Sequence, residues 1–399
     1  MRTPPPPPEW AAELFSVGVT GTNGKTSTTA AVANMLAAVA RPVARVTTVG
    51  AFLDDEAQQV SPHYAGFLET MQRCRERGGR LAAVELTSEA LGLGFARAWP
   101  WRIGVFTNLS HDHLDVHQSL EHYLACKAQL FMALPEGGVA VLNAFDANAE
   151  LIREVLPAGV ELLPYGLPSR GTAWTQPLLT ASQVVPSLSG TRIRLAASAR
   201  FPELPQEMHI RAIGEIFAEN ALAALAAALV ASVPVKLAVR ALAETTPPAG
   251  RFEIVSEAPC VVVDYAHTPD ALVRTLATAR TLCAGRLTLV FGAGGQRDRA
   301  KRPLLGAAAR AADRIVLTSD NPRDEDPLAI MAHVSEGIGA HANVLKEPNR
   351  ARAIELALEG ATSRDLVLIA GKGHERTQEQ AGKKLPFSDV AIVRRLLSK

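Results

Sequence analysis

A glycine-rich segment near the start of the chain combines the residue types that bind phosphate. It reads Gly18-Val-Thr-Gly21-Thr22-Asn23-Gly24-Lys25-Thr26, after an apolar run and before a helical one. Such a loop directs backbone N–H groups and a helix N-terminus at phosphate. In this spacing Lys25 would reach the terminal phosphates of a nucleotide, and the Thr26 hydroxyl would hold Mg²⁺. The alternative is an ordinary glycine-rich turn, since Val19 stands where the strict pattern has glycine.

A second group of candidate ligands follows a later apolar run. Three histidines and two aspartates fall within seven residues: His111, Asp112, His113, Asp115 and His117. Upstream, Glu85 ends another apolar run. Ligands of parallel sheets bind at the carboxyl ends of strands, so we expect these side chains to lie near the phosphate loop. Carboxylates and neutral imidazoles beside a nucleotide suit a divalent cation, and the alternative is a solvated polar loop.

Further polar loops follow apolar runs in the second half of the chain. They span 264–270, 292–303, 320–323 and 371–375. Each by itself is compatible with ordinary loop composition. Their shared position at the ends of strands predicts a common binding face.

The elements that must position these loops alternate along the chain. Apolar strand candidates at 15–20, 81–86, 103–108, 138–143, 261–265, 288–291, 314–318 and 366–369 are separated by Ala- and Leu-rich helical stretches such as 26–39. This alternation predicts an α/β fold with mostly parallel, doubly wound sheets. Residues 165–212 are expected to be a β-rich insertion. Residues 221–235 are expected to form a buried helix, shorter than the ~20 residues of a membrane span.

The length of 399 residues predicts two or three domains at roughly 150 residues each. A Pro- and Gly-containing stretch, residues 245–251, is typical of a linker and puts a boundary near residue 249. We therefore expect a Pro-rich extended tail over 1–14, a nucleotide-binding domain over 15–249 and a second domain over 250–399. The tail lacks the apolar segment of a signal peptide.

Composition excludes several classes of protein. The 41 Lys and Arg balance 40 Asp and Glu, so the chain lacks the charge pattern of a general nucleic-acid binder. Its four cysteines contain no CxxC pair, and their spacing indicates neither a disulfide framework nor a zinc cluster. These features predict a cytoplasmic protein with neither nucleic acid nor membrane as its partner.

Taken in order, the motifs resemble the Mur ligase family and, within it, most closely the MurE enzymes. Those enzymes add the third residue of the peptidoglycan stem to a UDP-N-acetylmuramoyl-dipeptide. The matching segments are GTNGKT, TNLSHDHLDVH, DYAHTPDAL, GAGGQRDRAKRP, DNPR and GKGHE, and the resemblance extends over roughly residues 15–395. It implies a central P-loop domain, a C-terminal Rossmann-like α/β domain and an ATP-dependent carboxylate–amine ligase that forms an acyl phosphate, which an amine then attacks.

The resemblance also implies site residues. ATP would contact Gly21, Thr22, Asn23, Gly24, Lys25, Thr26, Asn220, Arg251 and Asp264. Two Mg²⁺ sites would involve Thr26, Glu85, His113 and Lys127, with Lys127 carbamylated so that it offers the anionic oxygen that a hard cation prefers. The catalytic set would be Lys25, Glu85, His113, Lys127, Asp264 and His267. For Lys127 the alternative is a solvated helix lysine.

The incoming amino acid is implied by the DNPR segment, which accompanies meso-diaminopimelate in MurE enzymes. Arg323 would clamp one carboxylate in a two-pronged hydrogen bond. Arg297 would bind the other carboxylate, and Asp320 and Glu375 would hold the distal ammonium. Asn321 and Gly371 would add polar contacts.

Departures from the family pattern fall on the acceptor side. MurE enzymes carry an N-terminal UDP-sugar-binding domain ahead of the phosphate loop, whereas here that loop begins at residue 18. Glu89 replaces a family histidine, and Phe95 replaces an arginine that meets the acceptor carboxylate. Both changes disfavour a dianionic acceptor, so we hypothesise an acceptor that is not UDP-anchored: a small carboxylic acid, a peptide, or an acid supplied by a carrier protein.

Alternative hypotheses remain open. One is an ordinary peptidoglycan MurE acting on UDP-MurNAc-L-Ala-D-Glu, with the UDP-binding domain supplied elsewhere. Others are a degenerate ATP-binding homologue without activity, a different P-loop enzyme such as a kinase, and a ligase like folylpolyglutamate synthase.

Overall fold

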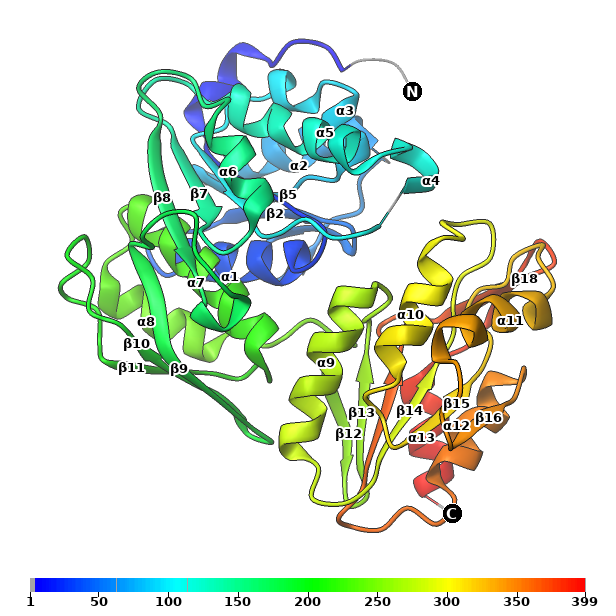
Figure 1. The fold of residues 1–399 in the computed structure, drawn as a ribbon. Coiled ribbons are helices and arrows are strands. Elements are labelled where there is room, and N and C mark those ends of the chain that lie inside the picture. Colours follow the sequence, from blue (N-terminus) through cyan, green and yellow to red (C-terminus); the bar gives the residue numbers. More distant parts are fainter. Residues whose placement is uncertain (1–3, 62, 113, 399) are drawn as a thin grey trace.

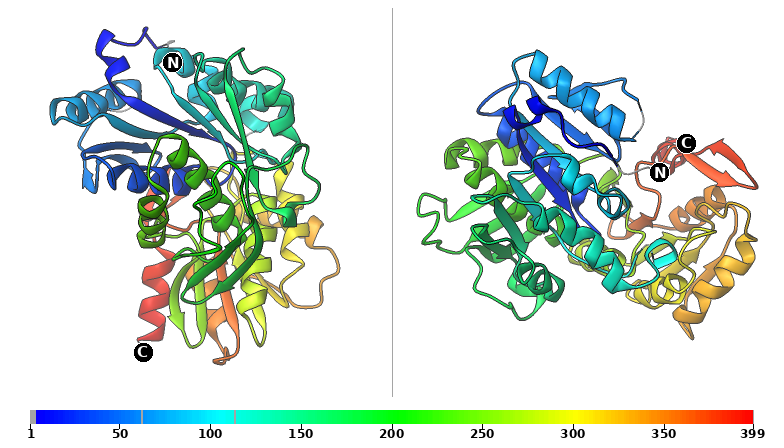
Figure 2. Two further views of the ribbon diagram at one scale, coloured as in Figure 1. Left: turned by 90° about the vertical axis from the view of Figure 1, so that its left-hand side faces the viewer. Right: turned by 90° about the horizontal axis from the view of Figure 1, so that it is seen from above.

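The computed structural model describes residues 4–61, 63–112 and 114–398, which form two lobes, each built on its own sheet (Figure 1). The N-terminal lobe, coloured blue to green, has an 11-stranded sheet, and the C-terminal lobe, yellow to red, has a six-stranded sheet. The further views show the lobes side by side (Figure 2). Helices alternate with mostly parallel strands in both lobes, which confirms the α/β fold predicted from the sequence.

The N-terminal sheet is parallel in its centre and antiparallel at both edges. Its strands are β1 (Phe15–Thr20), β2 (Val43–Thr47), β3 (Gly50–Leu53), β4 (Glu56–Ala57), β5 (Leu81–Glu85), β6 (Ile103–Phe106), β7 (Val139–Asn143), β8 (Glu161–Gly166), β9 (Leu179–Ser187), β10 (Gly190–Leu195) and β11 (Glu207–Ile210). They lie in the order β11-β10-β9-β8-β7-β6-β1-β5-β2-β3-β4, and the pairs from β2 to β9 are parallel. The predicted β-rich segment 165–212 thus extends one edge of this sheet.

Helices cover both faces of the N-terminal sheet, which explains why its central strands are apolar on both sides. One face carries α1 (Lys25–Ala37), α7 (Glu215–Val230) and α8 (Val235–Glu244). The other carries α2 (His63–Glu76), α3 (Ser88–Gly92), α5 (Leu120–Met132) and α6 (Ala147–Arg153), and a short helix, α4 (Leu114–His117), precedes α5. The helix expected over 221–235 is buried, but it begins at Glu215 and ends at Val230; Pro234 then begins α8.

The C-terminal lobe repeats this layered plan on a smaller scale. Its strands β12 (Glu253–Glu257), β13 (Cys260–Asp264), β14 (Leu287–Phe291), β15 (Arg314–Leu317), β16 (Val344–Lys346) and β17 (Leu366–Ala370) lie in the order β12-β13-β17-β14-β15-β16. Helices α9 (Pro269–Leu282), α10 (Lys301–Ala309) and α11 (Pro327–Ile338) cover one face, and α12 (Arg350–Leu358) and α13 (Asp389–Leu397) cover the other. A hairpin, β18 (Thr377–Gln380) and β19 (Lys383–Pro386), projects beside them.

The strand predictions agree with the structure to within two residues at each end. The expected linker, residues 245–251, contains neither helix nor strand, and the division into domains at residue 249 stays a prediction. The N-terminal stretch is less extended than expected, because a 3₁₀ helix (Glu9–Glu13) buries Ala11 and, with Leu14, joins the core beneath α2. Within the described ranges, no helix combines the length and apolarity needed to cross a membrane.

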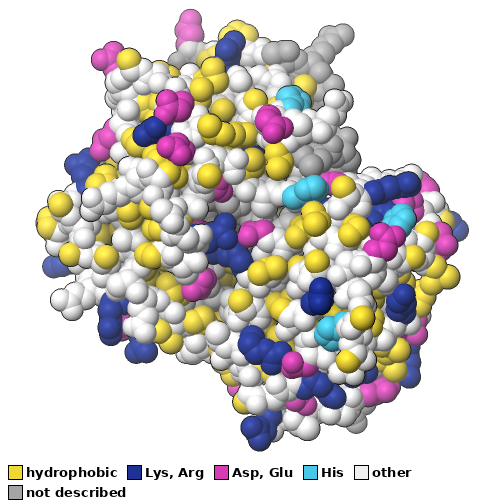
Figure 3. Space-filling model, viewed as in Figure 1, with side chains coloured by type: hydrophobic (Ala, Val, Ile, Leu, Met, Phe, Trp, Pro, Cys, Tyr) yellow, Lys and Arg dark blue, Asp and Glu magenta, His cyan; other side chains and the backbone are white. Residues whose placement is uncertain are grey.

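Apolar packing joins the two lobes. The core that contains α1 and α7 continues into α9 and α10 of the C-terminal lobe. This contact holds the carboxyl ends of β1, β5 and β6 opposite the loops that follow β13 and β14, since residues of both sets line the same cavities. On the face drawn in Figure 3, basic and acidic side chains are interspersed over both lobes.

Candidate active site between the lobes

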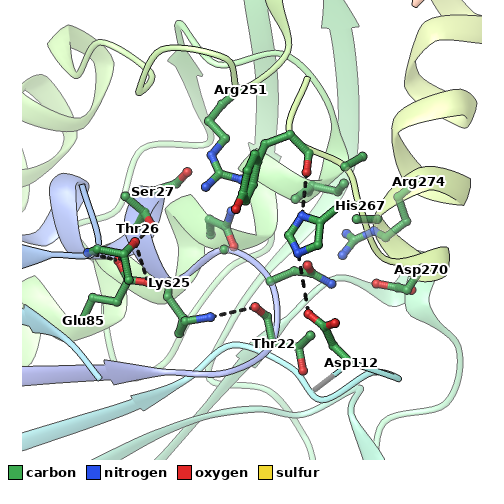
Figure 4. A pocket seen from close by; sticks show the side chains of 18 of the residues that line it. Thr22, Lys25, Thr26, Ser27, Glu85, Asp112, Arg251, His267, Asp270 and Arg274 are labelled. Carbon is green, nitrogen blue, oxygen red and sulfur yellow. Dashed lines mark hydrogen bonds and ion pairs between the residues drawn. The ribbon is translucent and has the colours of Figure 1, made fainter. Parts of the chain in front are cut away.

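The loop between β1 and α1 has a backbone that only glycine allows at two points. Gly24 has φ 87°, and a Cβ there would lie 2.1 Å from Asn220 Oδ1. Gly21 has φ 147°, and its Cβ would lie 1.9 Å from Thr107 Oγ1. The loop is therefore pressed against β6 and α7, so the N-terminus of α1 opens into a cavity of about 290 Å³ (Figure 4).

Oxygen ligands suitable for a hard cation meet at the base of this cavity. Thr26 Oγ1 donates to Glu85 Oε2 at 2.8 Å, and the backbone N–H of Thr48 donates to the same oxygen at 3.2 Å. Figure 4 shows the Thr26–Glu85 contact beside Lys25. A hydroxyl and a carboxylate at this spacing fit Mg²⁺, which prefers oxygen ligands. Thr48 was not predicted as a site residue, because the residues around it in the sequence form no recognisable motif.

Two lysines adjoin these oxygens, Lys25 partly buried and Lys127 fully buried. Lys25 Nζ donates to Thr22 O at 2.8 Å, and Lys127 Nζ donates to Gly21 O at 2.6 Å and lies 4.2 Å from the centre of the Tyr123 ring. Burial lowers the pKa of Lys25, and it lowers the pKa of Lys127 well below the ordinary value, with the charge of Lys25 adding to the effect. Lys127 is only 1% exposed, so the alternative of a solvated helix lysine is wrong.

Three buried nitrogens of residues that line this cavity lack a hydrogen-bond partner among the described residues. They are Asn220 Nδ2, Arg251 Nε and Arg274 Nη2, and all three are almost inaccessible to solvent. The Arg251 guanidinium lies 4.3 Å from the centre of the Tyr265 ring, which leaves its edge toward the cavity. Buried donors of this kind are costly unless a partner satisfies them, so they fit a ligand that carries hydrogen-bond acceptors, such as a nucleotide.

Asp264 lines the cavity and is held there by hydrogen bonds, and its roles in catalysis and nucleotide binding stay predictions. Its carboxylate accepts hydrogen bonds from the backbone N–H groups of Phe252 and Ala266, at 2.7 and 2.8 Å, and from Thr275 Oγ1 at 3.3 Å. These bonds fix the loop after β13 on α9 and hold Arg251 near Tyr265. The structure therefore places Asp264 in the cavity wall as a residue that positions others.

Charged residues connect the lobes beside the cavity. Asp112 Oδ1 accepts from Lys301 Nζ at 2.8 Å, and Asp112 Oδ2 lies 3.6 Å from His267 Nε2, whose Nδ1 is 2.8 Å from Tyr265 O. A second bridge joins His111 to Asp298 at 2.8 Å. Asp112 and Lys301 both belong to motifs noted in the sequence, but their pairing was not predicted, because it depends on how the lobes meet.

A second cavity, of about 240 Å³, lies in the C-terminal lobe and adjoins the first. All six residues expected to bind the amino acid line it: Arg297, Asp320, Asn321, Arg323, Gly371 and Glu375. Asp112, Tyr265 and His267 line both cavities. The two sites predicted from separate motifs thus share a wall.

Lys372 does not line the second cavity but bonds to two residues that do, and no role was predicted for it from the sequence. Its side chain is fully buried, and its Nζ donates to Asn321 Oδ1 at 2.9 Å and to Glu375 Oε2 at 2.7 Å. Burial by itself raises the pKa of Glu375, but the hydrogen bond and charge of Lys372 lower it more. The Gly-Lys-Gly sequence in GKGHE was the available signal for such a lysine.

Arg323 has an uncommon backbone conformation, which its hydrogen bonds and polar contacts stabilise. It has φ 52°, an uncommon value for a residue with a side chain. Its backbone N–H and C=O bond to the hairpin at Glu379 and Ala381, and its Nη1 donates to Gly295 O at 2.6 Å. Its Nε lies 3.4 Å from Glu379 Oε2. The guanidinium is thereby fixed across the mouth of the second cavity.

The structure brings together nearly all of the predicted site residues. The nucleotide cavity is lined by Thr22, Asn23, Gly24, Lys25, Thr26, Glu85, Lys127, Asn220, Arg251, Asp264 and His267, and Gly21 borders it through its bond to Lys127. His113, predicted as a metal ligand and catalytic residue, lies outside the described residues.

Two family models match the chain. The Mur ligase middle domain matches residues 19–228, and the glutamate ligase domain of Mur ligases matches residues 250–373. The chain belongs to the Mur ligase family. It is an ATP-dependent amide ligase by that membership, as the sequence resemblance implied.

Over most of its length, this Mur ligase is similar to curated relatives and to another ligase whose structure has been solved. The UDP-N-acetylmuramoyl-L-alanyl-D-glutamate–2,6-diaminopimelate ligases of Aquifex aeolicus and Alkalilimnicola ehrlichii are 38% and 40% identical to it. The matches cover 96% of this chain in both cases, and 77% and 76% of the relatives. A solved structure of a ligase with the same name is 34% identical, covers 96% of this chain and 78% of its own, and has a TM-score of 0.65.

The acceptor-side departures are also located. Glu89 is exposed and lines the nucleotide cavity near Glu85. Phe95 packs edge-on against Phe67 at 4.9 Å and Tyr64 at 5.2 Å. Phe95, the residue expected to depart from the family pattern, is therefore part of an aromatic cluster of this Mur ligase.

Proposed function

We propose that this Mur ligase joins an amino group of a diaminopimelate-like amino acid to an acceptor carboxylate activated at the expense of ATP. One observation carries the proposal: the nucleotide cavity and the amino-acid cavity share Asp112, Tyr265 and His267. An activated carboxylate formed at the shared wall would meet the incoming amine without leaving the protein. Holding both reactants in this way replaces a bimolecular encounter with an oriented one.

The chain's own residues would bind and orient the nucleotide. Lys25 and the N–H groups at the start of α1 would hold the terminal phosphates, while Asn220 and Arg251 would give their unpaired donors to the nucleotide. When bound, ATP and Mg²⁺ supply the phosphoryl group and the positive charge that turn a carboxylate into an acyl phosphate. Thr26 and Glu85 are the described residues that fit Mg²⁺.

Lys127 is proposed to react with CO₂ and to serve as a second anionic ligand. Burial favours its neutral amine, which is the form that attacks CO₂. The amine nitrogen forms a new N–C bond to CO₂ and one proton leaves to solvent, so the neutral side chain becomes an anionic carbamate. This anion would lie beside the cation of Lys25 and would add oxygen ligands beside Glu85.

The amino-acid cavity supports a substrate with a zwitterionic end. Arg323 and Arg297 would bind its carboxylates, and Asp320 and Glu375 its ammonium. The names of the similar curated ligases include 2,6-diaminopimelate. Tyr265 and His267, at the shared wall, would orient the reacting amine, and Asp112 would accept its proton directly or through His267.

The acceptor is proposed to be a carboxylate that is not anchored by UDP, free or presented by a carrier protein. Exposed Glu89 adds negative charge where an anionic acceptor would approach, and Phe95 offers it no cation. The second candidate is the acceptor in the names of the similar ligases, UDP-N-acetylmuramoyl-L-alanyl-D-glutamate, favoured by the 38–40% identity.

The test is a screen for ATP-dependent phosphate release across amines and acceptors. We expect release to require both meso-diaminopimelate and a carboxylate acceptor, with mass spectrometry showing the amide. Turnover of UDP-MurNAc-L-Ala-D-Glu at the rate of an ordinary MurE would overturn the acceptor proposal and leave the ligase intact. ATP hydrolysis that ignores the amine, or none at all, would indicate a degenerate homologue.

A further inference from the structure

Three metal-binding side chains cluster on the N-terminal lobe, outside both cavities of the ligase site. His117 ends α4, and His122 and Cys126 lie one turn apart on α5, so they face the same side of the helix. One ligand atom from each lies within 4.8 Å of the other two. His117 and Cys126 are buried, whereas His122 is exposed and gives access from solvent. None of the proposed steps of the ligase reaction uses these side chains.

The distances in this cluster match a tetrahedral site. Cys126 Sγ lies 3.7 Å from His117 Nδ1 and 3.7 Å from His122 Nε2. Zinc bonds of about 2.3 Å to sulfur and about 2.05 Å to nitrogen, at a tetrahedral angle, put the two ligand atoms ~3.6 Å apart. Both sulfur–nitrogen distances thus agree with that value, and the two nitrogens lie within 4.8 Å of each other.

Outer contacts orient both imidazoles toward that centre. His122 Nδ1 lies 2.9 Å from the backbone carbonyl of His117, which can only accept, so Nδ1 carries the proton and Nε2 presents a lone pair to Cys126. His117 Nε2 lies 2.8 Å from Ser88 Oγ, which holds the ring with Nδ1 facing the sulfur. Histidine ligands of metals are fixed in this way, through the ring nitrogen that does not bind the metal.

We propose that His117, His122 and Cys126 bind a divalent cation of the zinc class. On binding, the Cys126 thiol loses its proton to solvent, and the thiolate and two neutral imidazoles each donate an electron pair to the metal.

The fourth position of such a metal would open to a groove. His122 and Cys126 line this groove together with Pro4–Pro6, Arg97 and Gln129. Water or a small anion would complete the tetrahedron there. The ligand set of two nitrogens and one sulfur also separates this site from the Mg²⁺ site at Thr26 and Glu85, because Mg²⁺ takes oxygen ligands.

The experiment is a Co²⁺ titration of the full-length, chelator-treated protein without ATP, because Co²⁺ reports a thiolate ligand by its charge-transfer absorption. We expect the band to saturate at one Co²⁺ per chain, to bleach when Zn²⁺ is added and to persist in excess Mg²⁺. Cys126→Ser removes the band. His122→Asn, a change at an exposed residue, raises the apparent Co²⁺ dissociation constant by at least about tenfold.

The matched control is Cys283→Ser, which changes a partly exposed cysteine in the C-terminal lobe and is expected to keep the band. Circular dichroism of each variant confirms that it is folded. Absence of Co²⁺ and Zn²⁺ binding, or a band that persists in Cys126→Ser, overturns the site, and unchanged affinity in His122→Asn overturns its ligand set. None of these results depends on ligase activity, so failure here and failure of the proposed reaction are separate outcomes.

Discussion

The two cavities of this Mur ligase hold their cations in different ways. On the nucleotide side, Lys25 and Lys127 donate to backbone carbonyls, which accept a hydrogen bond without cancelling a charge. On the amino-acid side, Lys372 lies 2.7 Å from Glu375, and Arg323 lies 3.4 Å from Glu379. Among the described residues, Lys25 and Lys127 therefore lack a hydrogen-bonded carboxylate and could bind an anionic ligand. On the amino-acid side, carboxylates of the protein already pair with the cations.

This difference indicates how each ligand would bind. Burial lowers the pKa of Lys25 and of Lys127, which disfavours their charged forms. The negative charge of a bound phosphate would raise both pKa values, so nucleotide binding should restore the charged forms or favour carbamylation of Lys127. A zwitterionic amino acid would instead exchange partners with groups already paired, adding no net charge. We expect the first site to set catalytic rate and the second to set selectivity between amines.

The largest effect tests the scaffold behind the amino-acid cavity. Arg350 and Asp389 form a fully buried ion pair with two bonds of 2.8 Å, and Arg350 also donates to the carbonyl of Ala370 at the end of β17. Arg350→Met leaves the Asp389 charge buried and unpaired. We expect a loss of about 3–5 kcal/mol in unfolding free energy, measured by chemical denaturation.

Arg352→Met is the control for this prediction, because Arg352 lies on the same helix and pairs with Glu355 at the surface. Its cost should stay below about 1 kcal/mol. Similar losses in the two variants would show that the buried pair does not brace this lobe.

The next effect concerns the nucleotide side. Lys25→Ala removes the cation that we propose to hold the phosphates, and among the described residues the Lys25 ammonium donates to the carbonyl of Thr22. We expect kcat for ATP-dependent phosphate release to fall about 100- to 1000-fold with little change in stability. The matched variant Lys236→Ala, at an exposed position on α8, should retain full activity. A fall of less than tenfold in Lys25→Ala would mean that backbone N–H groups alone stabilise the phosphate.

On the amino-acid side the expected change is smaller and falls on a different parameter. Arg323→Ala removes the charged hydrogen bonds that we propose for a substrate carboxylate. The loss of roughly 1.5–3 kcal/mol of binding energy should raise the KM for diaminopimelate about 10- to 150-fold. The KM for ATP should stay constant. Arg323→Lys restores charge but not the two-pronged geometry, so it should recover only part of the loss.

The control for Arg323 is Arg310→Ala, at an exposed position at the end of α10. Equal KM values for diaminopimelate in Arg323→Ala and Arg310→Ala would refute the assignment of Arg323. A rise in the KM for ATP of the same size would instead show that the arginine acts on the arrangement of the lobes.

The sequence was sufficient where one motif forms one local structure. The phosphate loop and the strand ends follow from glycine positions and from apolar runs that parallel sheets bury on both faces, so β1 was predicted at its observed bounds. Asp112, Lys301 and Lys372 were missed as partners because their contacts depend on how separate loops meet. The zinc-class cluster was missed for a related reason: cysteine spacing says nothing about a single cysteine completed by two histidines.

The smallest effect is a pH dependence on the amino-acid side. Glu325 accepts from the buried Arg302 at 2.9 and 3.1 Å and from the backbone of Gln296, and its pKa is lowered from 4.5 to about 2, chiefly by the hydrogen bonds of Arg302. A carboxyl with a lowered folded-state pKa stabilises the protein above its unfolded pKa and stops doing so as the pH falls toward the folded value. Glu325→Gln should therefore cost about 1 kcal/mol at pH 7, and this difference in unfolding free energy should shrink between pH 4.5 and about 2. Thermal unfolding of both proteins across that range measures this difference in unfolding free energy. A difference independent of pH would show that Glu325 acts through packing and neutral hydrogen bonds. The ion pair would then contribute nothing to the charge balance within the lobe.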